Sequence, residues 1–256
     1  NMGTAWGDVD GDGLSDLFVT HLGTETHTLW RQGPRGMFLD SSASAGIVAA
    51  ERTTAFGTVM ADFDLDGDLD LAWTSGRVFA GPAAAAPALP PEWRRYAERN
   101  VLMENDGSGR FRSVSAANPA FCGVPNVARP LCAGDIDGDG DVDLVAGTTA
   151  GRVLLLDNVA ERRGHWLVVR ALDPALRRDA VGAVVAVTAG GRRLERLVQP
   201  ATGYLSSNDP RVHFGLGDAD TIDGVEVLWP GGTRERFEGG RADRIVEVLR
   251  GSGSTP

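Results

Sequence analysis

Three aspartate-rich segments of nine residues place the tightest constraint on how this chain folds. They begin at Asp8, Asp62 and Asp135, and in each of them aspartate recurs at alternate positions around at least one glycine. Carboxylates this close together repel one another unless a cation lies between them. Several flexible oxygen ligands favour calcium over magnesium, zinc or copper. The three segments therefore predict three tight loops that bind about three Ca²⁺ ions.

The formal net charge of −10 comes from these loops. They hold 14 of the 35 acidic residues, and the rest of the chain has 21 acidic and 25 basic residues. This balance excludes an acidic tail, and it is too weakly basic for a nucleic-acid-binding surface. The 34 glycines and an aromatic content of only 7% indicate many tight turns, as in an all-β protein.

The sequence around the acidic loops repeats as well. We expect a strand of small residues before each loop, an apolar strand after it and then a third strand, with a fourth in the first two copies. Four short antiparallel strands per repeat predict a propeller blade. The third loop follows at a longer interval because residues 77–99 form an insertion. Three blades cannot close a ring of roughly four to eight. We therefore expect further blades or neighbouring subunits to complete it, and this chain to be part of a longer protein.

A different pattern begins at residue 161. Six or more apolar strands, separated by Gly, Pro and Asp turns, occupy residues 161–250. This density of short strands predicts a β-sandwich. We expect residues 251–256 to form a flexible tail.

The repeats over residues 1–160 resemble the FG-GAP or VCBS repeats of integrin-α-like β-propellers. The resemblance rests on the D-x-D-x-D-G-x-x-D loops between strands and on the turn Asn105–Phe111. It implies that each loop binds calcium through side chains at positions one, three, five and nine, and through the backbone carbonyl at position seven. The implied ligands are Asp8, Asp10, Asp12, Leu14 and Asp16; Asp62, Asp64, Asp66, Asp68 and Asp70; and Asp135, Asp137, Asp139, Asp141 and Asp143.

The second half resembles the ASPIC/UnbV domain, which follows such repeats in many secreted proteins. The resemblance implies no particular reaction. The matching stretches are Trp166–Arg170, Arg178–Ala183, Gly203–Ser207, His213–Gly217 and Val225–Gly232.

The insertion and one turn of the second half are candidate partner contacts. We expect a short helix over residues 92–99 after a Pro-rich linker. Aromatic and Arg side chains gathered in one such insertion are typical of interface hot spots. A variable loop packed on its own blade is the alternative. The candidate contacts are Trp93, Arg94, Arg95, Tyr96, Arg99 and Tyr204.

No motif in the sequence indicates catalysis. The four histidines are scattered without zinc-ligand spacing, and no nucleophile elbow or phosphate loop occurs. We expect His213 to bond a turn backbone rather than to act as a general base. Cys122 and Cys132 either form a disulfide, as an oxidising compartment allows, or remain two buried thiols. No run of about 18 apolar residues is present, so we expect no membrane-spanning helix.

These features predict an extracellular or periplasmic, non-catalytic scaffold that calcium stabilises and that binds a protein or polysaccharide partner. Two alternatives stay open: an accessory subunit of a larger extracytoplasmic assembly or filament, and a calcium-dependent glycan-binding or glycan-active protein.

Overall fold

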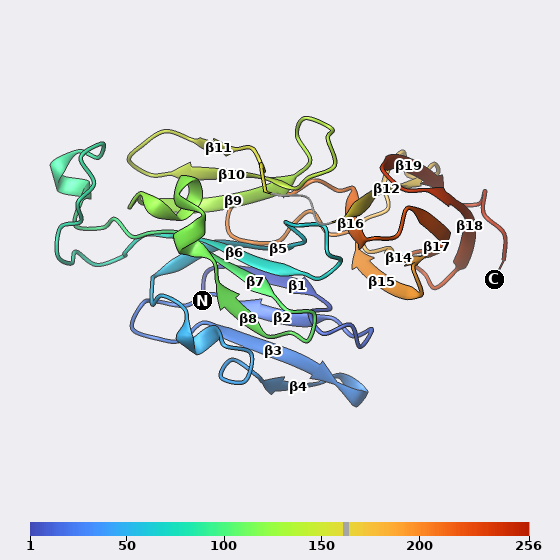
Figure 1. Ribbon diagram of the computed structural model, residues 1–256, viewed down its shortest axis with the longest axis horizontal. Helices are drawn as coiled ribbons and strands as arrows, with labels where there is room; N and C mark the ends of the chain where they lie inside the picture. The colour runs from blue at the N-terminus through green and yellow to red at the C-terminus, as the bar shows by residue number, and fades with distance from the viewer. Residues whose placement is uncertain (161–163, 256) are drawn as a thin grey trace.

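The computed structural model describes residues 1–160 and 164–255 and consists of antiparallel sheets in two regions (Figure 1). Residues 4–156 form three sheets whose strands pair in chain order, two of four strands and one of three. This arrangement confirms the expected blades of a partial propeller. The strands are β1 Thr4–Gly7, β2 Asp16–Val19, β3 Thr28–Gly33 and β4 Met37–Asp40; β5 Ala55–Ala61, β6 Asp70–Ser75, β7 Val101–Asn105 and β8 Phe111–Ser113; and β9 Ala128–Gly134, β10 Asp143–Thr148 and β11 Leu154–Leu156.

Apolar clusters join neighbouring blades. Phe18 of the first blade packs with Trp73 of the second, and Ala72 of the second packs with Leu131 of the third. The innermost strands β1, β5 and β9 lie side by side. A Cβ atom at Gly57 would lie 2.5 Å from the backbone nitrogen of Leu131, so only glycine allows β5 to approach β9 this closely.

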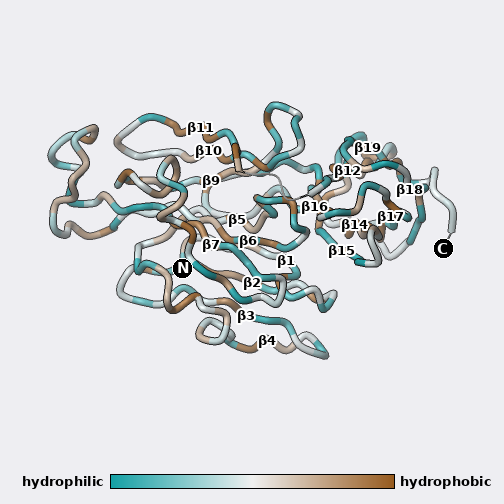
Figure 2. The backbone as a smooth tube through the Cα atoms, viewed as in Figure 1, coloured by the Kyte–Doolittle hydropathy of each residue, from teal (hydrophilic) through white to brown (hydrophobic). Residues whose placement is uncertain are grey.

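Residues 165–249 form the expected β-sandwich. One sheet contains β12, β13, β16 and β19, with β19 parallel to β12, and the other has the order β15-β14-β17-β18. Leu167, Phe214 and Trp229 are buried in the core between the two sheets. Figure 2 shows the edge strands β15 and β18 as largely hydrophilic, as expected for solvent-facing edges. The strands are β12 His165–Asp173, β13 Arg178–Asp179, β14 Val184–Ala189, β15 Arg192–Leu197, β16 Val212–Gly217, β17 Thr221–Leu228, β18 Arg234–Arg241 and β19 Arg244–Leu249.

Residues 199–209, here called the axial segment, run from the sandwich back along the inner strands of the blades (Figure 1). The Gly203 N–H donates to the Thr4 carbonyl of β1 at 2.8 Å. The side-chain oxygen of Asn208 accepts the N–H of Ala133 on β9 at 2.9 Å. The axial segment therefore ties the first and third blades to the C-terminal domain.

Helical structure in the described residues is limited to single turns. The helix expected over residues 92–99 is wrong, because Glu98 pairs its backbone N–H and carbonyl with Asn126 instead of continuing a helix. No helix among the described residues has the length and apolarity to cross a membrane. The turns are the 3₁₀ helices η1 Pro34–Gly36, η2 Ile47–Ala49, η3 Pro91–Trp93 and η4 Ser115–Ala117, and the π-helical turn η5 Pro119–Gly123.

The disulfide interpretation of Cys122 and Cys132 is also wrong for this structure, because both thiols are free. Cys122 packs in the core between the second and third blades, together with Leu131 and Ala133 of β9. Side chains alternate between the faces of a strand, so Cys132 points away from that core. Burial raises the pKa of the Cys122 thiol to about 11, which makes it a poor nucleophile.

The C-terminal residues do not extend freely as the expected flexible tail would. Ser254 exchanges two backbone hydrogen bonds with Arg236 of β18, at 2.8 and 2.9 Å. Residues 251–255 therefore add to the second sheet of the sandwich.

We expect Phe214→Ala to lower the free energy of unfolding of the sandwich by about 3–5 kcal/mol, because the ring is fully buried and its loss leaves a cavity. Urea unfolding followed by near-UV circular dichroism measures this change. Leu205→Ala is the control, since Leu205 is 79% exposed and its truncation should cost less than about 0.5 kcal/mol. Equal effects of the two substitutions would contradict the packing of this core.

Candidate metal centres

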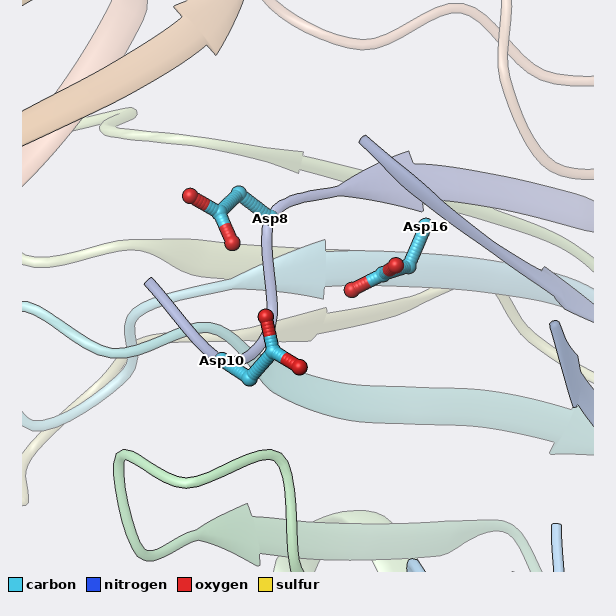
Figure 3. Close-up of side chains that lie close together, drawn as sticks. All are labelled: Asp8, Asp10 and Asp16. Carbon is cyan, nitrogen blue, oxygen red and sulfur yellow. The ribbon is translucent and has the colours of Figure 1, made fainter. Parts of the chain in front are cut away.

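Each acidic loop joins the first two strands of a blade and brings three carboxylates together. The ligand oxygens of each trio lie within 4.8 Å of one another. Figure 3 shows the three side chains of the first loop, which lie close together. The trios are Asp8, Asp10 and Asp16; Asp62, Asp64 and Asp66; and Asp135, Asp137 and Asp143.

The other predicted ligands lie outside these trios. Asp12 accepts the N–H of Leu14 at 2.8 Å, a bond that stabilises the turn. Asp70 is buried and accepts the N–H groups of Phe63 and Asn105, as Asp16 and Asp143 do with the equivalent residues of their blades. The trio of the second loop contains the aspartate at position five, whereas the other two trios contain the one at position nine. The predicted ligands outside the trios are Asp12, Leu14, Asp68, Asp70, Asp139 and Asp141.

The same local contacts shape all three loops. The aspartate at position one accepts the N–H of the glycine at position six, and that glycine has a positive φ in each loop. The residue at position four also has a positive φ, a conformation that glycine adopts without strain. The bonded pairs are Asp8 and Gly13 at 2.9 Å, Asp62 and Gly67 at 2.8 Å, and Asp135 and Gly140 at 3.2 Å.

Two of the trios contain a buried carboxylate oxygen without a hydrogen-bond partner, Oδ1 of Asp10 and Oδ1 of Asp62. Leaving such an oxygen unpaired costs roughly 1–3 kcal/mol. Burial, followed by the charge of Asp66, raises the pKa of Asp62 to about 7. Burial also raises the pKa of Asp16 to about 6. A divalent cation would pair these oxygens and keep the carboxylates ionised, so the residues present fit a hard metal ion.

Asparagines at the ends of third strands link the loops of neighbouring blades, a role that the sequence reasoning missed. The side-chain amide of Asn105 donates to the carbonyl of Val9 in the first loop at 2.8 Å. The amide of Asn158 donates likewise to Phe63 in the second loop at 2.8 Å. Their backbone N–H groups bond the aspartate at position nine of their own blade. The signal was an Asn that recurs at the end of the third strand in the second and third blades.

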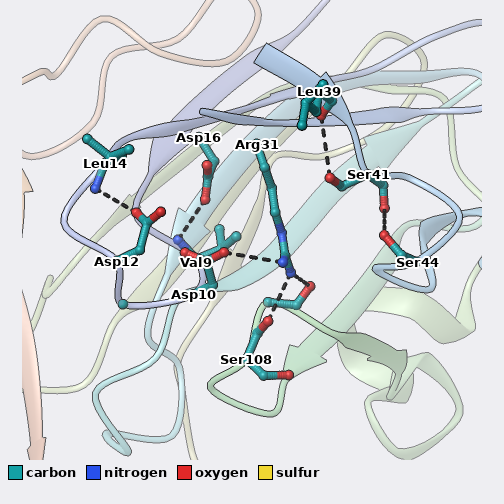
Figure 4. A network of polar contacts seen from close by, with 12 residues as sticks. Val9, Asp10, Asp12, Leu14, Asp16, Arg31, Leu39, Ser41, Ser44 and Ser108 are labelled. Carbon is teal, nitrogen blue, oxygen red and sulfur yellow. Dashed lines mark hydrogen bonds and ion pairs between the residues drawn. The ribbon is translucent and has the colours of Figure 1, made fainter. Parts of the chain in front are cut away.

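Blade one has Gln32 at the equivalent place. Its backbone N–H donates to Asp16 at 2.9 Å, but its side chain makes no hydrogen bond among the residues that the structure describes. Arg31 beside it pairs with Asp10 at 3.2 Å and donates to the Ser108 carbonyl at 2.9 Å (Figure 4). A cation from the same blade therefore contacts the first loop.

None of the histidines in the described chain belongs to an acidic trio. His213 donates its Nε2 proton to the Gly140 carbonyl at 2.8 Å, so it bonds a turn backbone as expected. Burial lowers the pKa of His213 to about 4, and the ring is therefore neutral.

The candidate partner residues lie at the end of the blades opposite the sandwich (Figure 1). An open groove of about 640 Å³ there is lined by both Trp93 and Tyr96, whose rings are 5.8 Å apart. Tyr204 of the axial segment packs on Phe56 at 5.1 Å, and the Arg129 guanidinium lies over the other side of that ring at 3.8 Å. Phe56 and Arg129 also line the groove, whereas Tyr204 only packs on Phe56 behind it.

The three arginines of the insertion do not line this groove. Their guanidinium groups bond backbone carbonyls of neighbouring turns, which fixes the shape of the insertion. The bonds join Arg94 to Leu89 at 3.0 Å, Arg95 to Gly81 at 3.2 Å and Arg99 to Gly123 at 3.1 Å.

Comparison with known proteins agrees with this architecture. Residues 8–73 match the family described as FG-GAP-like repeat, and residues 174–255 match the family described as ASPIC and UnbV. The chain is similar to cartilage acidic protein 1 of Homo sapiens, with 26% identity over 96% of this chain and 44% of that protein. The Mus musculus protein of the same name is 27% identical over 90% of this chain and 42% of its own length. The chain spans less than half the length of these curated relatives.

The metal-free protein should lose stability as the pH rises. Burial raises the pKa of Asp70 from 3.8 to about 8, so the folded state holds a proton that the unfolded state releases. This contribution is complete below the unfolded pKa and is lost as the pH rises through about 8. We expect the Tm of protein stripped with chelating resin to fall from about pH 5 to about pH 8. Asp70→Asn should flatten the profile, and a Tm that rises over this range in both proteins would contradict the assignment.

Proposed function

We propose that this chain, in which FG-GAP-like repeats precede an ASPIC and UnbV domain, is an extracytoplasmic scaffold for interaction with a partner and is stabilised by calcium. The observation that supports it most directly is the gathering of three carboxylates within 4.8 Å in each of three loops. Calcium at extracellular concentrations suits acidic loops of modest affinity. In this proposal the ions neutralise the crowded loops and hold the blades rigid.

We also propose that the loops are not catalytic centres. In the described part of the chain, each of them gathers three carboxylates and no histidine or cysteine at one point, a donor set that suits binding of a hard cation. The position-one carboxylates are engaged by backbone N–H groups of their own loop. This arrangement suits a structural ion.

The groove between the insertion and the strands β5 and β9 is the proposed contact for a protein or polysaccharide partner. It presents Trp93 and Tyr96 beside a charge pair in which Arg77 lies 3.3 Å from Glu98. Aromatic rings with polar tips offer large contact area together with hydrogen-bonding groups. Because Arg77 is already paired, the groove suits a partner of low charge.

Calcium should raise the thermal stability of the chain. At a free concentration about 100-fold above Kd, each site adds about 2.7 kcal/mol of stability. We expect the Tm to rise on addition of calcium and to return to its starting value with EGTA, as measured by differential scanning calorimetry. Asp10→Asn should reduce the rise, because it removes a ligand from one trio only. An identical Tm in calcium and in EGTA would reject the proposed metal role.

A second candidate function, an accessory subunit of a larger assembly, is supported by the outer face of the first blade. Trp6 is 38% exposed there and meets the ring of Phe38 edge to face at 6.1 Å. The side chain of Gln32 stands where Asn105 and Asn158 bond the preceding blade. The face thus suits a further blade with an acidic loop.

Sedimentation velocity tests this candidate. We expect the chain to associate as its concentration rises, because burial of the exposed apolar face is favourable. Trp6→Glu should weaken the association at least about tenfold, which corresponds to 1.4 kcal/mol. Leu176→Glu, at an exposed position of the sandwich, is the control. A chain that stays monomeric, or equal effects of both substitutions, would contradict a neighbouring subunit on this face.

A further inference from the structure

The segment His213–Gly217, part of the resemblance to ASPIC/UnbV domains, lies against the acidic loops of the blades. His213 bonds the carbonyl of Gly140 in the third loop at 2.8 Å. The N–H of Gly217 donates to the carbonyl of Leu65 in the second loop at 3.0 Å. A Cβ atom at Gly215 would lie 1.9 Å from Oδ2 of Asp62, so glycine is needed for this approach. The segment therefore contacts the backbone of both the second and the third loop.

Leu65 adopts a backbone conformation in the second loop that is unfavourable for a residue other than glycine. It occupies position four, where the other two loops have Gly11 and Gly138, and its φ is +66°. A left-handed conformation costs a non-glycine residue roughly 1 kcal/mol. The side chain is only 1% exposed and packs with Trp166 and Val168 of the sandwich. Its burial between the domains offsets the backbone cost.

Arginines of the sandwich complete the contact. Arg192 donates to the Asp66 carbonyl at 2.8 Å and pairs with the Asp68 carboxylate. Arg211 donates to the Asp135 carbonyl of the third loop at 3.0 Å. These donors bond backbone carbonyls whose positions depend on how the loop is folded.

The first loop provides an internal comparison. Within residues 1–160 and 164–255, no hydrogen bond or ion pair joins residues 8–16 to the sandwich. The cation that contacts it, Arg31, belongs to its own blade. Two loops of the same chemistry are therefore bonded to the sandwich, whereas the first loop meets it only across a cavity that Asp8 and Arg196 both line.

We infer that the metal-loaded second and third loops are the docking socket of the C-terminal sandwich, with Leu65 as its anchor. The inference rests on the proposed binding of calcium. An ion that holds Asp62, Asp64 and Asp66 together also holds the carbonyls of Leu65 and Asp66 in place. Loss of the ion lets the like-charged carboxylates separate, and the socket loses the shape that Gly217 and Arg192 bond. The sandwich then moves away from the two loops, and only the axial segment still holds it to the blades.

Small-angle scattering of the full chain tests the inference, with hydrogen exchange at Gly217 as a second readout. In saturating calcium we expect a compact wild type, and in EGTA a larger radius of gyration with about tenfold faster exchange at Gly217. Asp64→Asn should expand the chain even in calcium. Asp10→Asn removes a ligand from the first loop and should leave the chain compact.

Leu65→Gly separates docking from metal binding. It gives the second loop the residue that the other two loops have at position four, so calcium stoichiometry by titration calorimetry should match wild type while the chain expands. If Leu65→Gly and chelated wild type both stay compact with unchanged Gly217 exchange, the docking inference is wrong while the proposed function stands. If wild type binds no calcium, the proposed function fails, and with it the dependence of docking on metal.

Discussion

Repulsion among crowded carboxylates is the constraint on which the rest of this structure depends. In each loop the chain has to bring three like charges within 4.8 Å, and it does so with glycine turns and backbone N–H groups that bond the first aspartate. These bonds offset part of the repulsion, but Asp62 still has a buried oxygen without a partner. A cation is the simplest means of balancing this charge, and the blades and the C-terminal domain are both built against the loops that it would hold.

The loops also connect the blades to one another. Asn105 and Asn158 each reach back to a carbonyl in the loop of the preceding blade, while their backbones bond the last aspartate of their own loop. Each acidic loop is thus both a candidate ion site and a joint between neighbours. A change in one loop therefore acts on two blades, and for the second and third loops on the sandwich as well.

The architecture followed from local patterns in the sequence, and the errors came from contacts between distant residues. Alternating aspartates and short apolar strands were enough to predict the blades and the sandwich. The helix over residues 92–99 failed because Glu98 pairs with the distant Asn126, which no local pattern reveals. The packing of Leu65 could not be predicted from local patterns either, because the residues that it contacts lie in the C-terminal sandwich.

The contacts of the axial segment constrain the order in which parts of the chain can pack together during folding. Its residues follow all three blades in the sequence. It nevertheless bonds Thr4 in the first blade and Ala133 in the third blade. Contacts between such distant parts of a chain form slowly, since a long loop has to close before they contribute. During synthesis the inner strands therefore emerge with one side uncovered until residues 199–209 follow. This interval is when a nascent chain of this design is most exposed to mispairing, and when a chaperone would have most to protect.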